Sequence, residues 1–176
     1  MSASQNTFAD QATAAVTLHP TKHDQPESVT RPMVGLLNEC LAEAIDLHWQ
    51  AKQAHWNVKG PAFIGLHELF DTVAANLNGH ADLIAERATM LGGQAEGTIQ
   101  VAARRTTLPA FPLHTTDQQA HVDALSSGLA AFGANVRRAI AVAEEAGDRG
   151  TADLFTEVSR SVDKDTWFVE AHLSRS

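Results

Sequence analysis

Tyrosine is absent from this chain of 176 residues, and the other aromatic residues are few, with 7 Phe and 3 Trp. Sheet-forming sequences are enriched in aromatic and β-branched residues, whereas this chain is rich in Ala and 44% of its residues are hydrophobic. The composition therefore disfavours a sheet-rich fold and favours an all-α protein. The length fits a single domain that can bury a sizeable core.

Basic residues are also scarce, because 13 Lys and Arg face 21 Asp and Glu and the formal net charge is −8. This balance disfavours nonspecific attraction to nucleic-acid phosphates or anionic lipids and suits cations better. No apolar run approaches a membrane-spanning length, and the first residues lack the continuous apolar segment of a signal peptide. We therefore expect a cytoplasmic protein without a membrane partner.

Cysteine is represented by Cys40 alone, so no disulfide can form within the chain. Its place in an apolar helical stretch favours a small buried side chain over a redox role.

Two regions are predicted from the pattern along the chain. Residues 1–29 are rich in Ser, Thr, Gln and Asp without sustained periodicity, and they are interpreted as a flexible N-terminal tail. Residues 30–176 are predicted to form one helical domain, in which apolar residues recur at steps of three and four.

Four long helices are expected in this domain. The first is predicted to begin with Thr30 as its cap and to end near residue 58, before the Gly60-Pro61 break. The second ends at Gly92-Gly93, and the third begins with the T-x-x-Q pattern at 115–118 and ends at Gly147. The fourth follows directly, with an apolar stripe that includes Leu154 and Phe168.

A long connection, residues 94–114, separates the second and third helices and has one short periodic piece near 99–104. The predicted fold is therefore all-α: a ferritin-like four-helix bundle with a long crossover that carries a short helix between helices 2 and 3.

Candidate metal ligands gather around the Gly-Pro break. The stretch "QAHWNVKGPAFIGLHELFD" contains His55, His67 and Asp71, and "GHADLIAER" adds Asp82 and Glu86. An antiparallel hairpin would bring His55 opposite His67, with Asp71 one turn further on. Two imidazoles and a carboxylate suit Fe(II) better than Ca²⁺ or Mg²⁺, which prefer oxygen shells. The alternative interpretation is a solvated polar stripe.

The spacing along the second helix divides these ligands into two half-sites. Asp71 and Asp82 are separated by about 16 Å along the helix axis, whereas the ligands of one ion lie roughly 2 Å from it. One chain therefore cannot close the site, and a two-fold related copy would pair each half-site with its complement. The sequence argues against a di-iron site inside one bundle, because such sites use Glu-x-x-His pairs and no Glu here has a His three residues later.

The sequence closely resembles the Dps family of bacterial miniferritins in "KQAHWNVKGPAF", "LHELFD", "ADLIAER", "LGG" and "DKDTWFVEAHL". The resemblance implies a ferroxidase site between subunits, with His55, His67 and Asp71 from one chain and Asp82 and Glu86 from its two-fold mate. It implies a hollow homo-dodecamer that oxidises Fe(II), preferably with hydrogen peroxide rather than oxygen, and stores Fe(III) in its cavity. It also places Trp56 near the iron, where the alternative role is ordinary packing.

Other polar residues are assigned structural roles or left open. His48 is expected to pack rather than to bind metal, His80 to lie at the surface or an interface, and His121 to be solvated. An acidic cluster lies where the third predicted helix turns into the fourth, and it resembles the family's iron-entry pores. The alternative interpretation is an ordinary charged turn. The members of the cluster are Glu144, Glu145, Asp148 and Asp153.

Two competing functions remain. Many family members compact DNA through basic tails, but the tail here has Lys22 against Asp10, Asp24 and Glu27, so DNA binding is expected to be weak. A structural helical dimer that holds an inert metal such as Zn²⁺ would keep the ligands without turnover.

Overall fold

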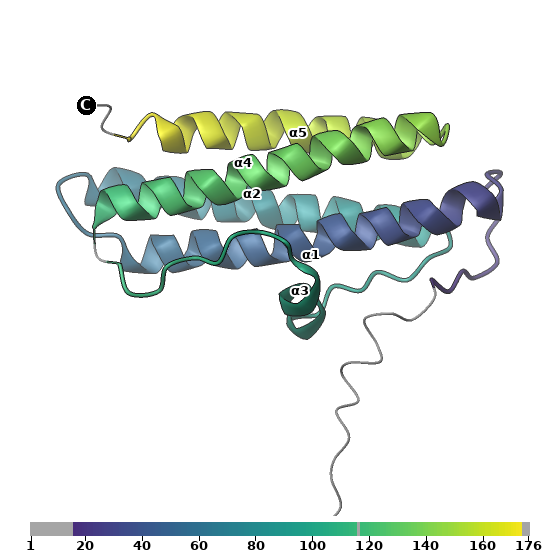
Figure 1. Ribbon diagram of the computed structural model, residues 1–176, viewed down its shortest axis with the longest axis horizontal. Helices are drawn as coiled ribbons and strands as arrows, with labels where there is room; N and C mark the ends of the chain where they lie inside the picture. Colours follow the sequence, from purple (N-terminus) through teal and green to yellow (C-terminus); the bar gives the residue numbers. More distant parts are fainter. Residues whose placement is uncertain (1–15, 116, 174–176) are drawn as a thin grey trace, which may run out of the picture.

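The computed structural model describes residues 16–115 and 117–173, which contain five helices and no strand. Four long helices lie side by side in a bundle, and one short helix lies against its side (Figure 1). The helices are α1 (Glu27–Asn57), α2 (Phe63–Met90), α3 (Ile99–Arg105), α4 (Gln118–Glu145) and α5 (Arg149–Glu170). The predicted all-α, ferritin-like four-helix bundle with a helix in the crossover is confirmed.

Helices α1 and α2 pack together as one hairpin, and α4 and α5 as another. The segment between α2 and α4 runs from one end of the bundle to the other, with α3 about halfway along it and packed on α1 (Figure 1). This crossover makes α1 contact α4 and α2 contact α5.

The start of α1 differs from the prediction, because the helix begins at Glu27 and Thr30 is buried within it. Pro26 occupies the cap position with φ −71° and ψ 154°, and no side chain caps the helix. Glu27 instead places a carboxylate in the first turn, where it favours the helix dipole, and it pairs with Arg31 four residues later.

The start of α4 also differs, since Asp117 rather than Thr115 is the cap. The Asp117 carboxylate accepts a hydrogen bond from the backbone N–H of Ala120 at 3.2 Å. An ionised carboxylate both satisfies a free N–H and complements the positive end of the helix dipole.

The core face of α5 is shifted from the predicted stripe. Phe155 is fully buried and Leu154 only partly, while Phe168 is 38% exposed. Phe168 directly precedes the buried Val169, so its side chain points about 100° away around the helix.

Part of the predicted tail contacts the bundle. Residues 16–26 form no helix, but Val16 and Leu18 pack against the core and the His19 N–H donates to the Gly92 carbonyl at 2.7 Å. Gly92 has φ +84°, and a Cβ there would lie 2.7 Å from the His19 carbonyl oxygen, so both backbone conformation and space require glycine. The rest of that predicted tail, residues 1–15, lies outside the described residues.

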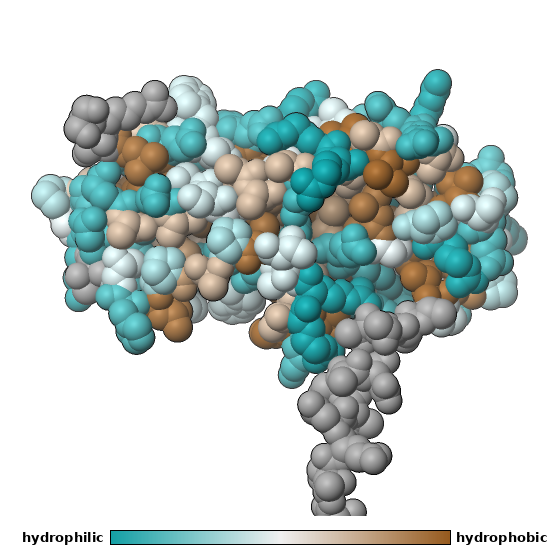
Figure 2. Space-filling view, viewed as in Figure 1, coloured by the Kyte–Doolittle hydropathy of each residue, from teal (hydrophilic) through white to brown (hydrophobic). Residues whose placement is uncertain are grey.

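The core runs along the whole bundle and has Phe70, Phe132 and Phe155 as its largest members. Cys40 is buried, and burial together with the charges of Glu43 and Glu39 raises the pKa of its thiol to about 12, as expected for a packing residue. On the face shown in Figure 2, hydrophobic residues form separate patches among hydrophilic ones. In the part of the chain that the structure describes, no helix is long and apolar enough to cross a membrane.

Candidate metal-binding site

The two histidines of the Gly-Pro hairpin face each other across α1 and α2, as the sequence predicts. Their rings stack with centroids 3.7 Å apart and planes 21° from parallel. Nδ1 of His55 lies 2.7 Å from the His67 carbonyl oxygen, and Nδ1 of His67 lies 2.8 Å from the His55 carbonyl oxygen. The hairpin is thus closed by a reciprocal pair of side chain to backbone hydrogen bonds.

These two carbonyls can accept the histidine hydrogen bonds because of where they lie in the two helices. His55 belongs to the last turn of α1, which ends at Asn57, so its carbonyl has no partner further along the helix. The imidazole of His67 supplies the missing donor. His67 lies in the second turn of α2, and its carbonyl uses a second lone pair to accept from His55.

These contacts fix which ring nitrogen of each neutral histidine can bind a metal. A carbonyl oxygen only accepts hydrogen bonds, so Nδ1 of each ring must carry the proton. In the neutral imidazole the lone pair then lies on Nε2. A backbone carbonyl bound to the other ring nitrogen is the usual support of a metal-binding histidine.

Asp71 lies one turn beyond His67 on α2 and is paired with Lys52 of α1. The Lys52 Nζ lies 2.5 Å from the Asp71 Oδ1. The hydrogen bond and positive charge of Lys52 hold the pKa of Asp71 below its usual value. The sequence interpretation missed Lys52, although its position three residues before His55 places it on the same face of α1.

Asp82 and Glu86 lie further along α2, and both are exposed. They are one helical turn apart, but Asp82 remains about 16 Å along the axis from Asp71. Within the described residues of a single chain, no three His, Cys, Asp or Glu side chains come together in a group that could hold a metal ion. The structure therefore joins His55 with His67 and leaves the predicted acidic pair separate from them.

Large apolar side chains are exposed on the two helices that carry the histidine pair. Trp56 is 58% exposed and Phe63 44% exposed, and Phe63 lies against the His67 ring with centroids 5.1 Å apart. The ring centroids of Trp56 and Trp49 lie 6.3 Å apart, and Trp49 is 45% exposed. The ammonium group of Lys52 lies over the Trp56 ring. Aromatic side chains exposed together in this way are typical of a surface that another protein covers.

The remaining histidines are placed differently from one another. Nδ1 of His48 lies 2.8 Å from the Ala74 carbonyl oxygen, which fits the predicted packing role. The expectation that His80 lies at the surface or an interface is wrong for a single chain, because its side chain is buried, and burial lowers its pKa. His121 was expected to be solvated but is 1% exposed and stacked on Phe111. Both histidine rings are buried. The spacing of apolar residues along a helix does not predict this burial, because histidine is not counted among the apolar residues.

The acidic cluster is divided by the structure. Asp148 is fully buried and caps α5, accepting from the Thr151 N–H at 3.1 Å and from Nη2 of Arg87 at 2.6 Å. This arrangement supports the structural role for Asp148, whereas Glu144, Glu145 and Asp153 are exposed.

The chain is similar to known proteins in both sequence and structure. Residues 34–176 match the family model described as Ferritin-like domain. The "DNA protection during starvation protein" of Agrobacterium fabrum is 46% identical over 155 residues, which cover 88% of this chain and 96% of that protein. Among solved structures, DpsA14 from Streptomyces coelicolor has a TM-score of 0.86 at 31% identity and covers 93% of this chain and 96% of its own. Dps from Microbacterium arborescens, described "in the high iron form", has a TM-score of 0.79 at 34% identity, covering 85% of this chain and 96% of its own.

Proposed function

Because the chain belongs to the Dps family of ferritin-like proteins, we propose that it is a ferroxidase that oxidises Fe(II) at sites shared between two subunits. Hydrogen peroxide is the preferred oxidant, with oxygen as the slower one, and Fe(III) is stored in the cavity of a cytoplasmic homo-dodecamer. The single observation that carries this proposal is the His55–His67 pair, with both Nδ1 atoms bound to backbone carbonyls.

The residue types suit the substrate. His55 and His67 would bind Fe(II) through their Nε2 atoms, and Asp71 would supply a carboxylate oxygen from the next turn of α2. Imidazole nitrogen is a good ligand for iron, and carboxylate oxygens increasingly favour the ion as it becomes Fe(III). A site that combines imidazole and carboxylate ligands therefore favours the removal of one electron from the bound Fe(II) ion.

Lys52 supplies a countercharge to Asp71. Its ammonium group pairs with the carboxylate of Asp71 and must leave that oxygen when Fe(II) binds. The positive charge of Fe(II) then replaces the charge of Lys52. Since both side chains are partly exposed, the displaced ammonium group can be hydrated, and the exchange costs little.

A second copy of the chain would complete the site with Asp82 and Glu86. An antiparallel two-fold arrangement of α2 places the acidic pair of one chain beside the histidine pair of the other, and it does so twice. The exposed Trp49, Trp56 and Phe63 would be covered in such a dimer.

The oxidation balances without any further reactant. Each hydrogen peroxide molecule takes one electron from each of two Fe(II) ions and two protons, and leaves as two molecules of water. Two-electron reduction of peroxide avoids the hydroxyl radical that a single Fe(II) ion would release. This chemistry protects DNA without requiring the protein to bind it.

The DNA-compacting alternative gains no support from the described residues. In the segment before α1, residues 16–26, Lys22 is the one Lys or Arg and Asp24 opposes it. The relative from Agrobacterium fabrum is named for DNA protection. We propose that this chain protects DNA by removing Fe(II) and peroxide.

Stopped-flow mixing of the purified protein with Fe(II) and either peroxide or oxygen tests the proposal, together with the size of the assembly by size-exclusion chromatography. We expect faster oxidation with peroxide, a large closed assembly, and loss of the fast phase in His55→Ala. Tight metal binding without any accelerated oxidation would instead identify a structural dimer with an inert metal such as Zn²⁺. A monomer with full activity would contradict the shared site.

A further inference from the structure

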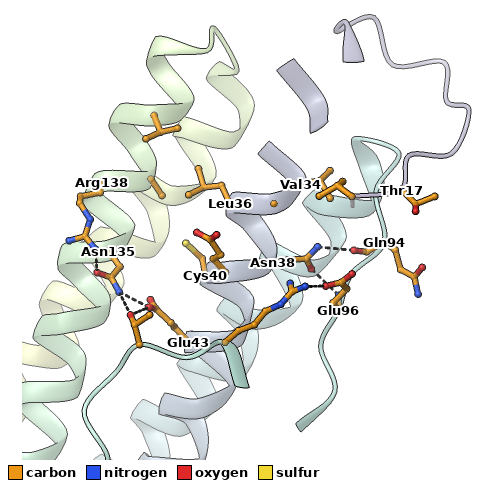
Figure 3. A pocket seen from close by; sticks show the side chains of 17 residues that line it. Thr17, Val34, Leu36, Asn38, Cys40, Glu43, Gln94, Glu96, Asn135 and Arg138 are labelled. Atoms are coloured by element: carbon orange, nitrogen blue, oxygen red, sulfur yellow. Dashed lines mark hydrogen bonds and ion pairs between the residues drawn. The ribbon is translucent and has the colours of Figure 1, made fainter. Parts of the chain in front are cut away.

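The crossover and α4 cover one side of α1, and His48 lies on another side of the same helix. Figure 3 shows the covered side, where Nδ2 of Asn38 donates to the Gln94 carbonyl at 3.0 Å and Nδ2 of Asn135 donates to Glu43 at 2.6 Å. His48 lies five residues after Glu43, about 140° further around the helix. Its side chain is therefore on the face of α1 that packs against α2.

His48 is held by α2 in the same way as the histidine pair. Its Nδ1 lies 2.8 Å from the Ala74 carbonyl oxygen, so Nδ1 of the neutral ring carries the proton and Nε2 carries the lone pair. Nε2 of His48 is accessible and has no hydrogen-bond partner among the described residues, whereas the unpartnered ring nitrogens of His80 and His121 are buried. Packing therefore uses one nitrogen of His48 and leaves the other for a ligand.

The side chains of His48 and His55 leave α1 in nearly the same direction. Seven residues correspond to almost two turns, so the two positions differ by about 20° around the helix and by about 10.5 Å along it. Both rings donate from Nδ1 to a carbonyl of α2. Nε2 of His48 therefore faces the same side of the hairpin as Nε2 of His55, which is the side that would receive the second copy.

The two-fold arrangement of the proposed function brings two copies of His48 together. On α2 the ligands His67 and Asp71 are centred on residue 69, and Asp82 and Glu86 on residue 84. An axis that places each of these pairs beside the other in the second copy crosses α2 midway, near residues 76 and 77. Ala74, which holds the His48 ring, is only about 4 Å from this point along the helix.

The donors next to this axis are nitrogens without carboxylates. Between Asp71 and Asp82, residues 72–81 of α2 contain no Asp or Glu. On α1, the Asp46 carboxylate is turned to the crossover, where it accepts from the Thr106 hydroxyl at 2.6 Å. Imidazole nitrogen suits Zn²⁺ and Cu²⁺, whereas Mg²⁺ and Ca²⁺ prefer oxygen ligands. The donor set therefore favours a borderline transition-metal ion over a hard one.

From this geometry we propose that the two His48 side chains of a two-fold pair bind one Zn²⁺ or Cu²⁺ ion on the axis through their Nε2 atoms, with water as the remaining ligands. The inference rests on the two-fold arrangement in the proposed function, but it does not require the oxidation of iron. The bound ion joins the two chains midway between the two ferroxidase sites.

Zinc stoichiometry tests this inference, because a site on a two-fold axis adds half an ion per chain. The iron-free full-length protein and its His48→Gln variant are dialysed against about 0.5 mM Zn²⁺, and bound zinc is measured by atomic emission. We expect a Kd of about 0.1 mM or tighter, since two ligands supply roughly half of the binding free energy of a four-ligand zinc site. His48→Gln should bind about half an ion per chain less than the wild type.

A control variant and a measurement on the wild type support the assignment. His114→Gln removes an exposed histidine of the crossover and should leave the zinc stoichiometry unchanged. Crystals of the zinc-loaded wild type need no variant, so they decide the question even if His48→Gln fails to assemble. Anomalous scattering at the zinc edge should show a peak on the two-fold axis between the two His48 side chains, apart from any zinc at His55 and His67.

Four results would overturn the inference. They are an unchanged stoichiometry in an assembled His48→Gln variant, its loss of a whole ion per chain, an equal loss in His114→Gln, and no anomalous peak on the axis. Failure of the proposed oxidation is distinguishable, because a protein that does not accelerate Fe(II) oxidation but keeps the half ion retains the axis site. A monomeric protein would contradict both proposals.

Discussion

His55 and His67 each donate a hydrogen bond from Nδ1 to the backbone carbonyl of the other, across rings that stack 3.7 Å apart. The end of α1 and the beginning of α2 are thereby joined through the same two residues that are candidate metal ligands. Stability of the hairpin and preorganisation of the ligands are consequently one property. Neither ring can rotate to present Nδ1 to a metal without losing its own hydrogen bond.

The first prediction concerns subunits that share a site. His67→Ala and Asp82→Ala proteins should each lose the fast phase of Fe(II) oxidation, whereas assemblies co-refolded from equal amounts of both should recover about a quarter of the sites. Half of the random two-fold pairs are mixed, and one of the two sites in a mixed pair is intact, if the two-fold arrangement is correct. Stopped-flow oxidation measures the recovery.

A matched control separates this result from nonspecific rescue. His67→Ala mixed with Asp71→Ala places both defects in the same half-site, so no combination of chains restores a complete site. Recovery in this control, or none in the first mixture, would contradict the shared geometry.

The second prediction concerns the ion pair of Lys52 with Asp71. Lys52→Met should tighten Zn²⁺ binding by between about 1.5-fold and 5-fold, because the ion no longer competes with the partly exposed Lys52 ammonium group for the Asp71 carboxylate, and such ion pairs are weak. Isothermal titration calorimetry measures the affinity, and Lys59→Met, at an exposed lysine near the turn, serves as the control. Weaker binding in Lys52→Met would mean that Lys52 positions Asp71 for the metal.

The third prediction concerns Asp148 and Arg87. Asp148→Asn should lower the free energy of unfolding by about 2–4 kcal/mol at neutral pH, because it weakens the cap of α5 and leaves a largely buried guanidinium group without its partner. Urea unfolding at constant protein concentration measures the change. Asp153→Asn, at an exposed position of the same helix, should change it by less than about 0.5 kcal/mol.

The same pair gives a pH dependence with a definite sign. Burial opposes ionisation of Asp148, but hydrogen bonds from Thr151 and the charge of Arg87 outweigh it and hold the pKa of this carboxyl below its usual value. The stabilisation is therefore fully present above the unfolded pKa of about 3.9 and is lost as the pH falls through the lower folded value. The difference between wild type and Asp148→Asn should stay constant from pH 7 to about pH 5 and shrink in stronger acid. A difference that grows on acidification would contradict this assignment.

The fourth prediction is weak DNA binding. With a net charge of −8 per chain, the protein should bind duplex DNA no more tightly than about 10 μM at physiological salt, since few cations are available to displace counterions. Gel-shift titrations over pH and salt measure it. Histidine protonation toward pH 6 should strengthen any binding, and added salt should weaken it. Tight binding at pH 8 and physiological salt that is lost when the predicted tail, residues 1–29, is removed would show that the tail acts as a DNA anchor.

The sequence alone determined the number and order of the helices and the chemical types at the candidate site. Apolar residues at steps of three and four, and breaks at Gly60-Pro61 and Gly147, are local signals that need no knowledge of the fold. The similar spacing of His55 and His67 on either side of the Gly-Pro break likewise predicts their approach, because an antiparallel hairpin brings residues at similar distances from its turn opposite each other.

Only the tertiary structure decided which atoms meet. The Nδ1 to carbonyl contacts, the Lys52–Asp71 pair and the burial of His121 depend on how the helices are rotated against each other. The buried carboxylate of Glu43 is the extreme case, because its hydrogen-bond partners Thr107 and Asn135 lie 64 and 92 residues away in the chain. Periodicity reports which face of a helix is buried, but the partner of a buried polar group is set by packing between segments that are remote in sequence.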